Sequence, residues 1–243
     1  MLKKNLLFLL LILPQFLAGQ KAAITLEKRD ILTYPYNDPN PVPILTERRD
    51  EIFPYHSFLG YSVKGTVQKW DVVKLENDYI QVWVMPSDGG KVWGAIEKST
   101  GKEFIYRNEV MKYRNISMRG PWTSGGIELN FGFIGHNPST CVPVDYKMTE
   151  NPDGSVSCIV GNYDLPSRTK WYVEVRLQKD KAYFDTYAMW INPTPLNQTY
   201  YNWMTGAAVV TDDLEFQYPG AAEIGQGGEC RLSPGNQAGR DDS

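Results

Sequence analysis

Alternating apolar and polar residues occupy most of the chain and predict β-strands. In residues 79–84, isoleucine and valine alternate with tyrosine, glutamine and tryptophan. Because successive side chains of a strand point to opposite faces, Ile80, Val82 and Val84 are expected to share one face. No segment after residue 20 has the spacing of an amphipathic helix. The pattern therefore predicts a chain built from strands.

Turn-forming residues separate these strands. Turns that contain glycine are expected at Asp88–Gly90, Ser99–Gly101 and Asp153–Gly154, and the last of them would close a hairpin. Further strands are expected at Val92–Ile96, at Glu103–Tyr106, on either side of Lys179–Lys181 and within residues 199–210. Strands at a spacing of about ten residues, with no helices between them, predict an all-β sandwich or barrel.

The first residues have the layout of a secretory signal peptide. A pair of lysines precedes a short apolar run, and the small residues Ala18 and Gly19 follow it. We expect residues 1–19 to be removed by cleavage near Gly19/Gln20, and the mature protein to be secreted or periplasmic. No transmembrane segment is expected after that cleavage, because no later run is long and apolar enough.

The rest of the chain divides into a lead-in and a domain. Residues 20–50 contain the sequence NDPNP and are expected to form an extended lead-in with turns. Residues 51–243 are expected to form the β-sandwich domain. Residues 224–243 are polar, rich in glycine and without a terminal strand pattern, which indicates a domain that is incomplete at its C-terminus.

Composition limits the kinds of ligand. The 25 basic and 28 acidic residues nearly balance, whereas a nucleic-acid-binding protein carries a basic surface, so no nucleic-acid partner is expected. There are two histidines, and the three cysteines lack the spacing of a zinc site. Neither a metal nor another cofactor is therefore expected. Cys141 and Cys158 flank a predicted turn, so they could form a disulfide or be two small core residues in neighbouring strands, which is the simpler interpretation.

The stretch GPWTSGGIELNFGFIGHNPST, residues 120–140, contains the strongest candidate chemistry. Glu128 and Asn130 are two residues apart and would point to the same side of a strand. A turn near Gly132 would place His136 opposite Glu128, where a carboxylate and an imidazole can serve as general base and general acid. The alternative is structural: His136 would bond a backbone carbonyl, and Glu128 would be solvated.

Aromatic and basic residues near this stretch point to a sugar as the ligand. Trp122 lies in an expected loop, where its ring could stack on the apolar face of a pyranose. Arg119 and Arg168 could contact carboxylates or vicinal hydroxyl groups, although surface salt bridges explain most arginines. The acids that could approach Glu128 are Asp88, Glu109 and Asp164.

Three blocks of the sequence resemble a known family. They are LENDYIQVWVMPSDGGKVWGAIEKSTGKEFIYRNEVMK, GPWTSGGIELNFGFIGHNPSTCVPVDY and NPTPLNQTYYNWMTGAAV. The family is domain of unknown function 5107, which occurs in secreted proteins of Bacteroidota-type bacteria, and the resemblance covers most of the chain. Because the family is similar in fold to galactose mutarotase, the resemblance implies an antiparallel β-supersandwich that binds sugars in a cleft. Members often continue into a longer chain.

Two functions are compatible with these features. In the first, the protein is a carbohydrate-active enzyme in which Glu128 and His136 act as acid/base partners, by glycoside hydrolysis or by mutarotase- or epimerase-like chemistry. Hydrolysis by a pair of carboxylates would need a second acid. The residues expected to contact the sugar are Asn130, Trp122, Arg119 and Arg168. In the second, the protein is a non-catalytic carbohydrate-binding or assembly module and His136 is structural.

Overall fold

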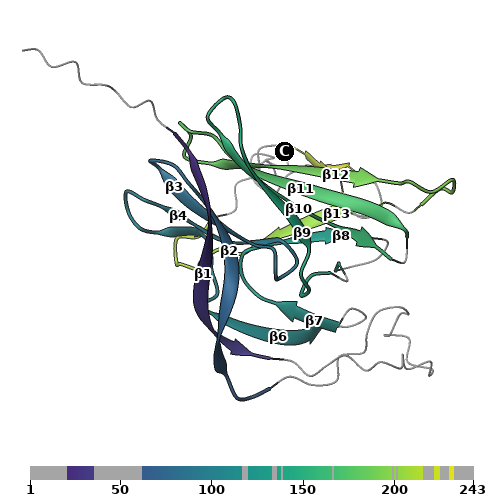
Figure 1. Cartoon of the computed structure of the whole chain (residues 1–243), viewed down its shortest axis with the longest axis horizontal. Helices are drawn as coiled ribbons and strands as arrows, with labels where there is room; N and C mark the ends of the chain where they lie inside the picture. Colours follow the sequence, from purple (N-terminus) through teal and green to yellow (C-terminus); the bar gives the residue numbers. More distant parts are fainter. Residues whose placement is uncertain are drawn as a thin grey trace, which may run out of the picture. The chain divides into compact units, whose positions relative to one another are not determined.

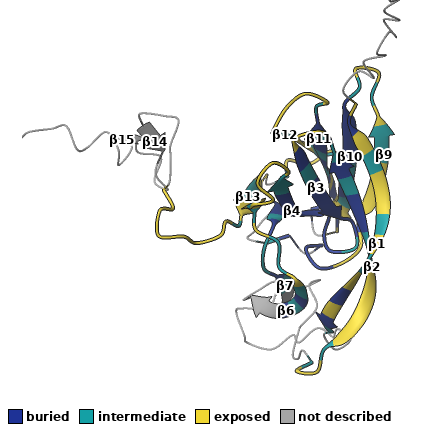
Figure 2. Cartoon of the chain, turned by 90° about the vertical axis from the view of Figure 1, so that its left-hand side faces the viewer, coloured by how far each residue is buried: buried dark blue, intermediate teal, exposed yellow. Residues whose placement is uncertain are grey.

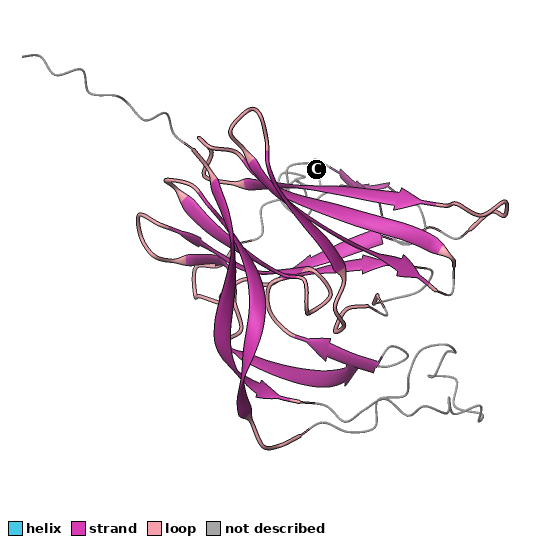
Figure 3. Cartoon of the chain, viewed as in Figure 1, coloured by secondary structure: helices cyan, strands magenta, loops and turns pink. Residues whose placement is uncertain are grey.

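The computed structural model describes residues 21–35, 62–116, 120–132, 136–137, 139–165, 167–198, 200, 202–215, 222–224 and 230–232. Within these ranges the protein is all-β, as predicted, and no helix is present (Figure 3). It follows that no described helix could cross a membrane. The expected signal peptide lies outside the described residues. The chain separates into two compact units, residues 1–209 and 210–243, which are described individually.

Nine strands of the first unit form its larger sheet (Figure 1). Their order is β13-β8-β4-β3-β2-β1-β6-β7, and β5 pairs with β4. The strands are β1 (Ala23–Tyr34), β2 (Thr66–Glu76), β3 (Ile80–Met85), β4 (Lys91–Glu97), β5 (Glu103–Ile105), β6 (Val110–Ile116), β7 (Gly120–Thr123), β8 (Ile127–Phe131) and β13 (Asn202–Gly206). Neighbouring strands are antiparallel except β1 and β6, which pair in parallel with Leu32 opposite Val110. The sheet is therefore not purely antiparallel, unlike the sheet that the resemblance implies.

Four strands form the second sheet of this unit, in the order β12-β11-β10-β9. They are β9 (Asp145–Glu150), β10 (Val156–Asp164), β11 (Thr169–Leu177) and β12 (Phe184–Ile191). The hairpins predicted around Asp153–Gly154 and Lys179–Lys181 join β9 to β10 and β11 to β12, so both are confirmed. In the described residues of the second unit, β14 (Ala222–Ile224) pairs antiparallel with β15 (Cys230–Leu232). The expectation that residues 224–243 lack a strand is therefore wrong at β15.

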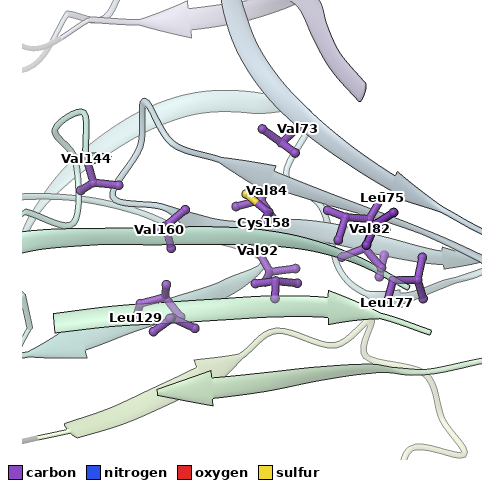
Figure 4. Close-up of a cluster of buried hydrophobic side chains, with 14 of the residues drawn as sticks. Val73, Leu75, Val82, Val84, Val92, Leu129, Val144, Cys158, Val160 and Leu177 are labelled. Atoms are coloured by element: carbon purple, nitrogen blue, oxygen red, sulfur yellow. The ribbon is translucent and has the colours of Figure 1, made fainter. Parts of the chain in front are cut away.

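One apolar core lies between the two sheets and receives side chains from both (Figure 4). Alternate residues of β2, β3, β8, β10 and β11 supply it, as the sequence predicts for Ile80, Val82 and Val84 of β3. The rings of Phe131 in β8 and Trp171 in β11 stack across the core, with centroids 5.0 Å apart and planes inclined by 2°. Removal of these side chains from water is the main force that holds the sheets together.

The larger sheet is also buried on its other face. A second cluster there consists of Ile31, Val72, Trp83, Met85, Trp93 and Met111. Trp83 lies between Val82 and Val84 in the sequence but points to the opposite side, so both faces of β3 are apolar. Figure 2 shows the resulting concentration of buried residues in β3. A polar side chain that shares this face with the cluster can be withdrawn from water, and it then needs hydrogen-bond partners.

Part of the expected lead-in is a strand of the larger sheet. Residues 25–34 are extended, as predicted, but they belong to β1, which pairs with β2 from Ala23 to Thr33. Charged residues interrupt its apolar pattern, and several of its side chains, such as Leu26, are exposed. The sequence pattern therefore understates how far this segment is integrated into the fold. Residues 36–50 lie outside the described residues.

Replacement of Phe131 by alanine tests the contact between the sheets. The variant would lose the stack on Trp171 and leave a cavity, so we expect the free energy of unfolding to fall by about 3–5 kcal/mol. Urea denaturation followed by circular dichroism measures this change. Leu165→Ala is the control, because Leu165 is 69% exposed and its loss should cost less than about 0.5 kcal/mol. Equal effects of the two substitutions would contradict the proposed packing.

Candidate functional site

Glu128 and Asn130 lie on the side of β8 that faces away from the core between the sheets. The residues that alternate with them, Leu129 and Phe131, belong to that core. Glu128 is 3% exposed and Asn130 is fully buried. Strand alternation thus places a carboxylate and an amide on one face, as the sequence predicts, but this face is buried.

The imidazole of His136 contacts the carboxylate of Glu128. Its Nδ1 atom lies 2.9 Å from both Oε1 and Oε2. Thr140 Oγ1 donates a second hydrogen bond to Oε1 at 2.8 Å, and Thr205 Oγ1 lies 3.5 Å from Oε2. The Glu128 side chain is 4% exposed, whereas that of His136 is 28% exposed. His136 is therefore the member of the pair that a ligand can reach.

The contact does not arise from the hairpin that the sequence predicts. The strand residue opposite Glu128 is Thr205 of β13, and the other neighbour of β8 is β4. His136 reaches the carboxylate from the connection that follows β8. Because Nδ1 is engaged by Glu128, the ring nitrogen through which His136 can act on a ligand is Nε2.

Two tryptophans flank the imidazole. Trp122 meets it edge-on with centroids 6.4 Å apart, and Trp203 does so at 4.9 Å. Trp122 lies in β7 rather than in the expected loop, because residues 120–123 pair with β6. Trp203 is the strand partner of Asn130. Its segment is predicted as a strand, but its position beside His136 depends on the pairing of β8 with β13, which the sequence pattern does not specify.

Asn130 supports the segment that carries His136. Its Oδ1 atom accepts a hydrogen bond from the backbone N–H of Asn137 at 2.8 Å. The Oδ1 atom of Asn137 in turn accepts one from the N–H of Ser139 at 2.9 Å. Within the described part of the chain, Nδ2 of Asn130 is buried without a hydrogen-bond partner. The contacts of Asn130 therefore fix the residue next to His136.

A second buried polar group lies around Asp88. Lys91 Nζ donates to the carbonyl oxygen and to Oγ1 of Thr123, both at 3.0 Å, and Thr123 Oγ1 donates to Asp88 Oδ2 at 2.6 Å. Burial raises the pKa of the Asp88 carboxyl; Lys91 and the bond from Thr123 oppose this change, and the charge of Glu128 adds to it. Asp88 is one of the three acids that the sequence suggests could approach Glu128, and its charge thus interacts with that of Glu128. It is itself fully buried.

Cys141 and Cys158 are both buried, and neither forms a disulfide. Cys158 lies in the core between the sheets, where burial raises the pKa of its thiol to about 12. Burial also raises the pKa of the Cys141 thiol well above its usual range, and the charge of Asp88 adds to this effect. Of the two interpretations of this pair, the structure supports core residues.

Of the two candidate arginines, the one that the structure describes, Arg168, is not brought to this site. Arg168 is exposed in the turn between β10 and β11, with a φ angle of 56°, and none of the described contacts joins it to Glu128 or His136. Arg119 lies outside the described residues. The described part of the chain also contains no group of three or more histidine, cysteine, aspartate or glutamate side chains that could hold a metal ion.

The fold and the site together define a β-sandwich protein with a buried carboxylate bonded to a partly exposed imidazole. The chain belongs to the family described as "Domain of unknown function (DUF5107)", whose model matches residues 47–241. This confirms the family that the three sequence blocks resemble. The protein is also similar to the crystal structure of a TPR-domain containing protein from Parabacteroides distasonis, with a TM-score of 0.65 and 25% sequence identity. That match covers 72% of this chain and 30% of the other.

The reactivity of the Cys141 and Cys158 thiols tests whether both side chains are buried. In a Cys230→Ser variant of the native protein, we expect neither Cys141 nor Cys158 to react with Ellman's reagent at pH 8, because burial shields both thiols and keeps them protonated. After unfolding in guanidinium chloride, without reductant, both should react. Rapid reaction of the native protein, or no reaction after unfolding, would contradict the structure.

Proposed function

We propose that this protein is a secreted carbohydrate-active protein in which His136 exchanges protons with a bound sugar. The observation that carries the proposal is the imidazole of His136, held at Nδ1 by Glu128 and flanked by Trp122 and Trp203. A partly exposed imidazole that is fixed in orientation suits general acid/base catalysis. The lysine pair and apolar run at the start of the chain support secretion.

Glu128 acts through His136 and not on the sugar directly. Its carboxylate is nearly inaccessible and is occupied by His136 and Thr140. A carboxylate on Nδ1 fixes the imidazole tautomer and compensates the positive charge that the ring acquires when Nε2 takes a proton. His136 is therefore the proposed catalytic residue, and Glu128 is a positioning residue. This assignment modifies the expectation that Glu128 itself is the base.

A sugar is the ligand that best matches the surroundings of His136. A pyranose has apolar C–H faces, which stack on indole rings, and hydroxyl groups, which exchange hydrogen bonds with an imidazole. Trp122 and Trp203 would supply the stacking surfaces. We also propose that the fold is a galactose-mutarotase-like supersandwich. The packing of a nine-stranded sheet on a four-stranded sheet supports this fold.

Proton transfer at the anomeric centre is the favoured reaction. Glycosidases use two carboxylates on either side of the scissile bond. Asp88, the described carboxyl group that is coupled to Glu128, is fully buried and so does not serve as the second one. A single imidazole that takes and returns a proton suits mutarotase- or epimerase-like chemistry, which requires no attacking water.

A non-catalytic sugar-binding module is the second candidate. The observation that favours it is the low exposure of Glu128, whose oxygens are engaged by His136 and Thr140. In that case His136 would be a fixed hydrogen-bonding group between two tryptophans. Such a protein would bind the sugar without changing it, so turnover separates the two candidates.

A comparison of site variants tests the catalytic role. The wild-type protein is screened against plant and host glycans for released reducing ends, and against reducing monosaccharides for anomeric exchange by NMR spectroscopy. For a substrate that is turned over, His136→Asn should lower kcat/KM by about 10²–10⁴-fold. Glu128→Gln should lower it as well and change its pH profile, because the amide cannot compensate the charge of the protonated ring.

Glu97→Gln is the matched control, because the Glu97 carboxylate bonds the side chain of Thr100 in an exposed turn and should leave turnover unchanged. Full activity of His136→Asn would remove the proposed catalytic residue. Binding of a glycan without turnover by the wild-type protein would select the non-catalytic module.

A further inference from the structure

The outer face of the four-stranded sheet carries a second group of aromatic and polar side chains. In β10 and β11, the residues on the inner face, such as Val160 and Trp171, belong to the core. The residues that alternate with them point outward, and in the sheet register Gly161 lies between Tyr172 of β11 and Asp145 of β9. The next outward pair along the strands is Tyr163 and Lys170.

A cleft of about 420 Å³ lies beside these outward-pointing side chains. Its lining residues are Asp145, Asn162, Tyr163, Lys170 and Tyr172. The volume lies within the range of about 300–1,000 Å³ that small-molecule sites occupy. Asn162 donates to Ser139 Oγ at 2.9 Å and so contacts the segment that follows His136. None of the lining residues bonds Glu128 or His136 itself, so the cleft is distinct from the proposed catalytic residue.

Gly161 lies against Tyr172, one of the residues that line the cleft. A Cβ atom at this position would lie 2.4 Å from Cδ1 of Tyr172, so the absence of a side chain lets the tyrosine ring lie across the strand. The ring of Tyr172 therefore packs against the backbone at Gly161, and Tyr172 lines the cleft. A flat aromatic face on a rigid strand is a suitable platform for the C–H groups of a sugar ring.

We infer that this cleft binds a pyranose unit of a glycan chain on the face of Tyr172. Lys170, two residues from Tyr172 in β11, and Asp145 of β9 are both exposed and also line the cleft. There an ammonium can donate to sugar hydroxyls and a carboxylate can accept from them. The presence of both charges favours a neutral ligand over an anionic one. Tyr163, which is 40% exposed, extends the aromatic surface along the strand.

The inference shares its ligand class with the proposed function but depends on different residues. A protein with two sugar-binding surfaces would hold a glycan chain at one while the other acts on it, which raises the effective concentration of the chain. The cleft would also bind sugar if His136 had no catalytic role. A loss of binding at the cleft can therefore be distinguished from a loss of turnover at His136.

Calorimetric titration with defined oligosaccharides tests the cleft. Cellohexaose, xylohexaose, mannohexaose and β-1,4-galactohexaose are each titrated into the wild-type chain. For an oligosaccharide that binds, Tyr172→Ala should weaken the affinity about tenfold or more. Asp145→Ala and Lys170→Ala provide a second test with exposed positions, where a folding defect is not expected, and each should weaken binding about threefold or more.

Tyr187→Ala is the matched control. Tyr187 lies on the same outer face, is 55% exposed and does not line the cleft, so its loss should leave the affinity unchanged. The inference is overturned if none of the four oligosaccharides binds, or if Tyr172→Ala, Asp145→Ala and Lys170→Ala all bind like the wild type.

Discussion

The two faces of β8 connect the core of the protein to its candidate site. On one face Leu129 and Phe131 enter the core between the sheets, where the ring of Phe131 stacks on Trp171. On the other face the same alternation presents Glu128 and Asn130. Because a strand cannot shift by one residue without exchanging its faces, the packing of Phe131 also fixes the direction of the Glu128 carboxylate. Stability and the geometry of the site thus depend on one register.

Burial of the Glu128 carboxylate imposes the next constraint. Withdrawal of a carboxylate from water costs free energy unless its oxygens accept hydrogen bonds. Three groups meet this demand: His136 Nδ1, Thr140 Oγ1 and, at longer distance, Thr205 Oγ1. Two of them, His136 and Thr140, lie in the connection between β8 and β9, and Asn130 anchors this connection through Asn137. The need to satisfy Glu128 therefore brings His136 to a defined position between Trp122 and Trp203, and this position is the basis of the proposed acid/base role.

Local patterns predict the strands and the hairpins, since alternation and turn residues act between neighbours in the sequence. The alternation also predicts that Glu128 and Asn130 share a face. Long-range pairing is what the sequence does not specify. Trp203 lies beside Asn130 because β13 returns to β8, and His136 meets Glu128 through a connecting segment and not through a hairpin. Trp122 is in a strand because β6 pairs with β7, although proline and glycine around it are typical of a loop.

Glu128 holds His136 at Nδ1 and leaves Nε2 for a ligand. The tautomer of the His136 ring tests this arrangement most directly. Long-range ¹H–¹⁵N NMR correlations of the imidazole, recorded where the ring is neutral, identify the protonated nitrogen. A His56→Gln background leaves His136 as the histidine in the spectrum. The proton should reside on Nδ1 in this background and lose that preference when Glu128→Gln is added. A proton on Nε2, unchanged by Glu128→Gln, would contradict the proposed arrangement.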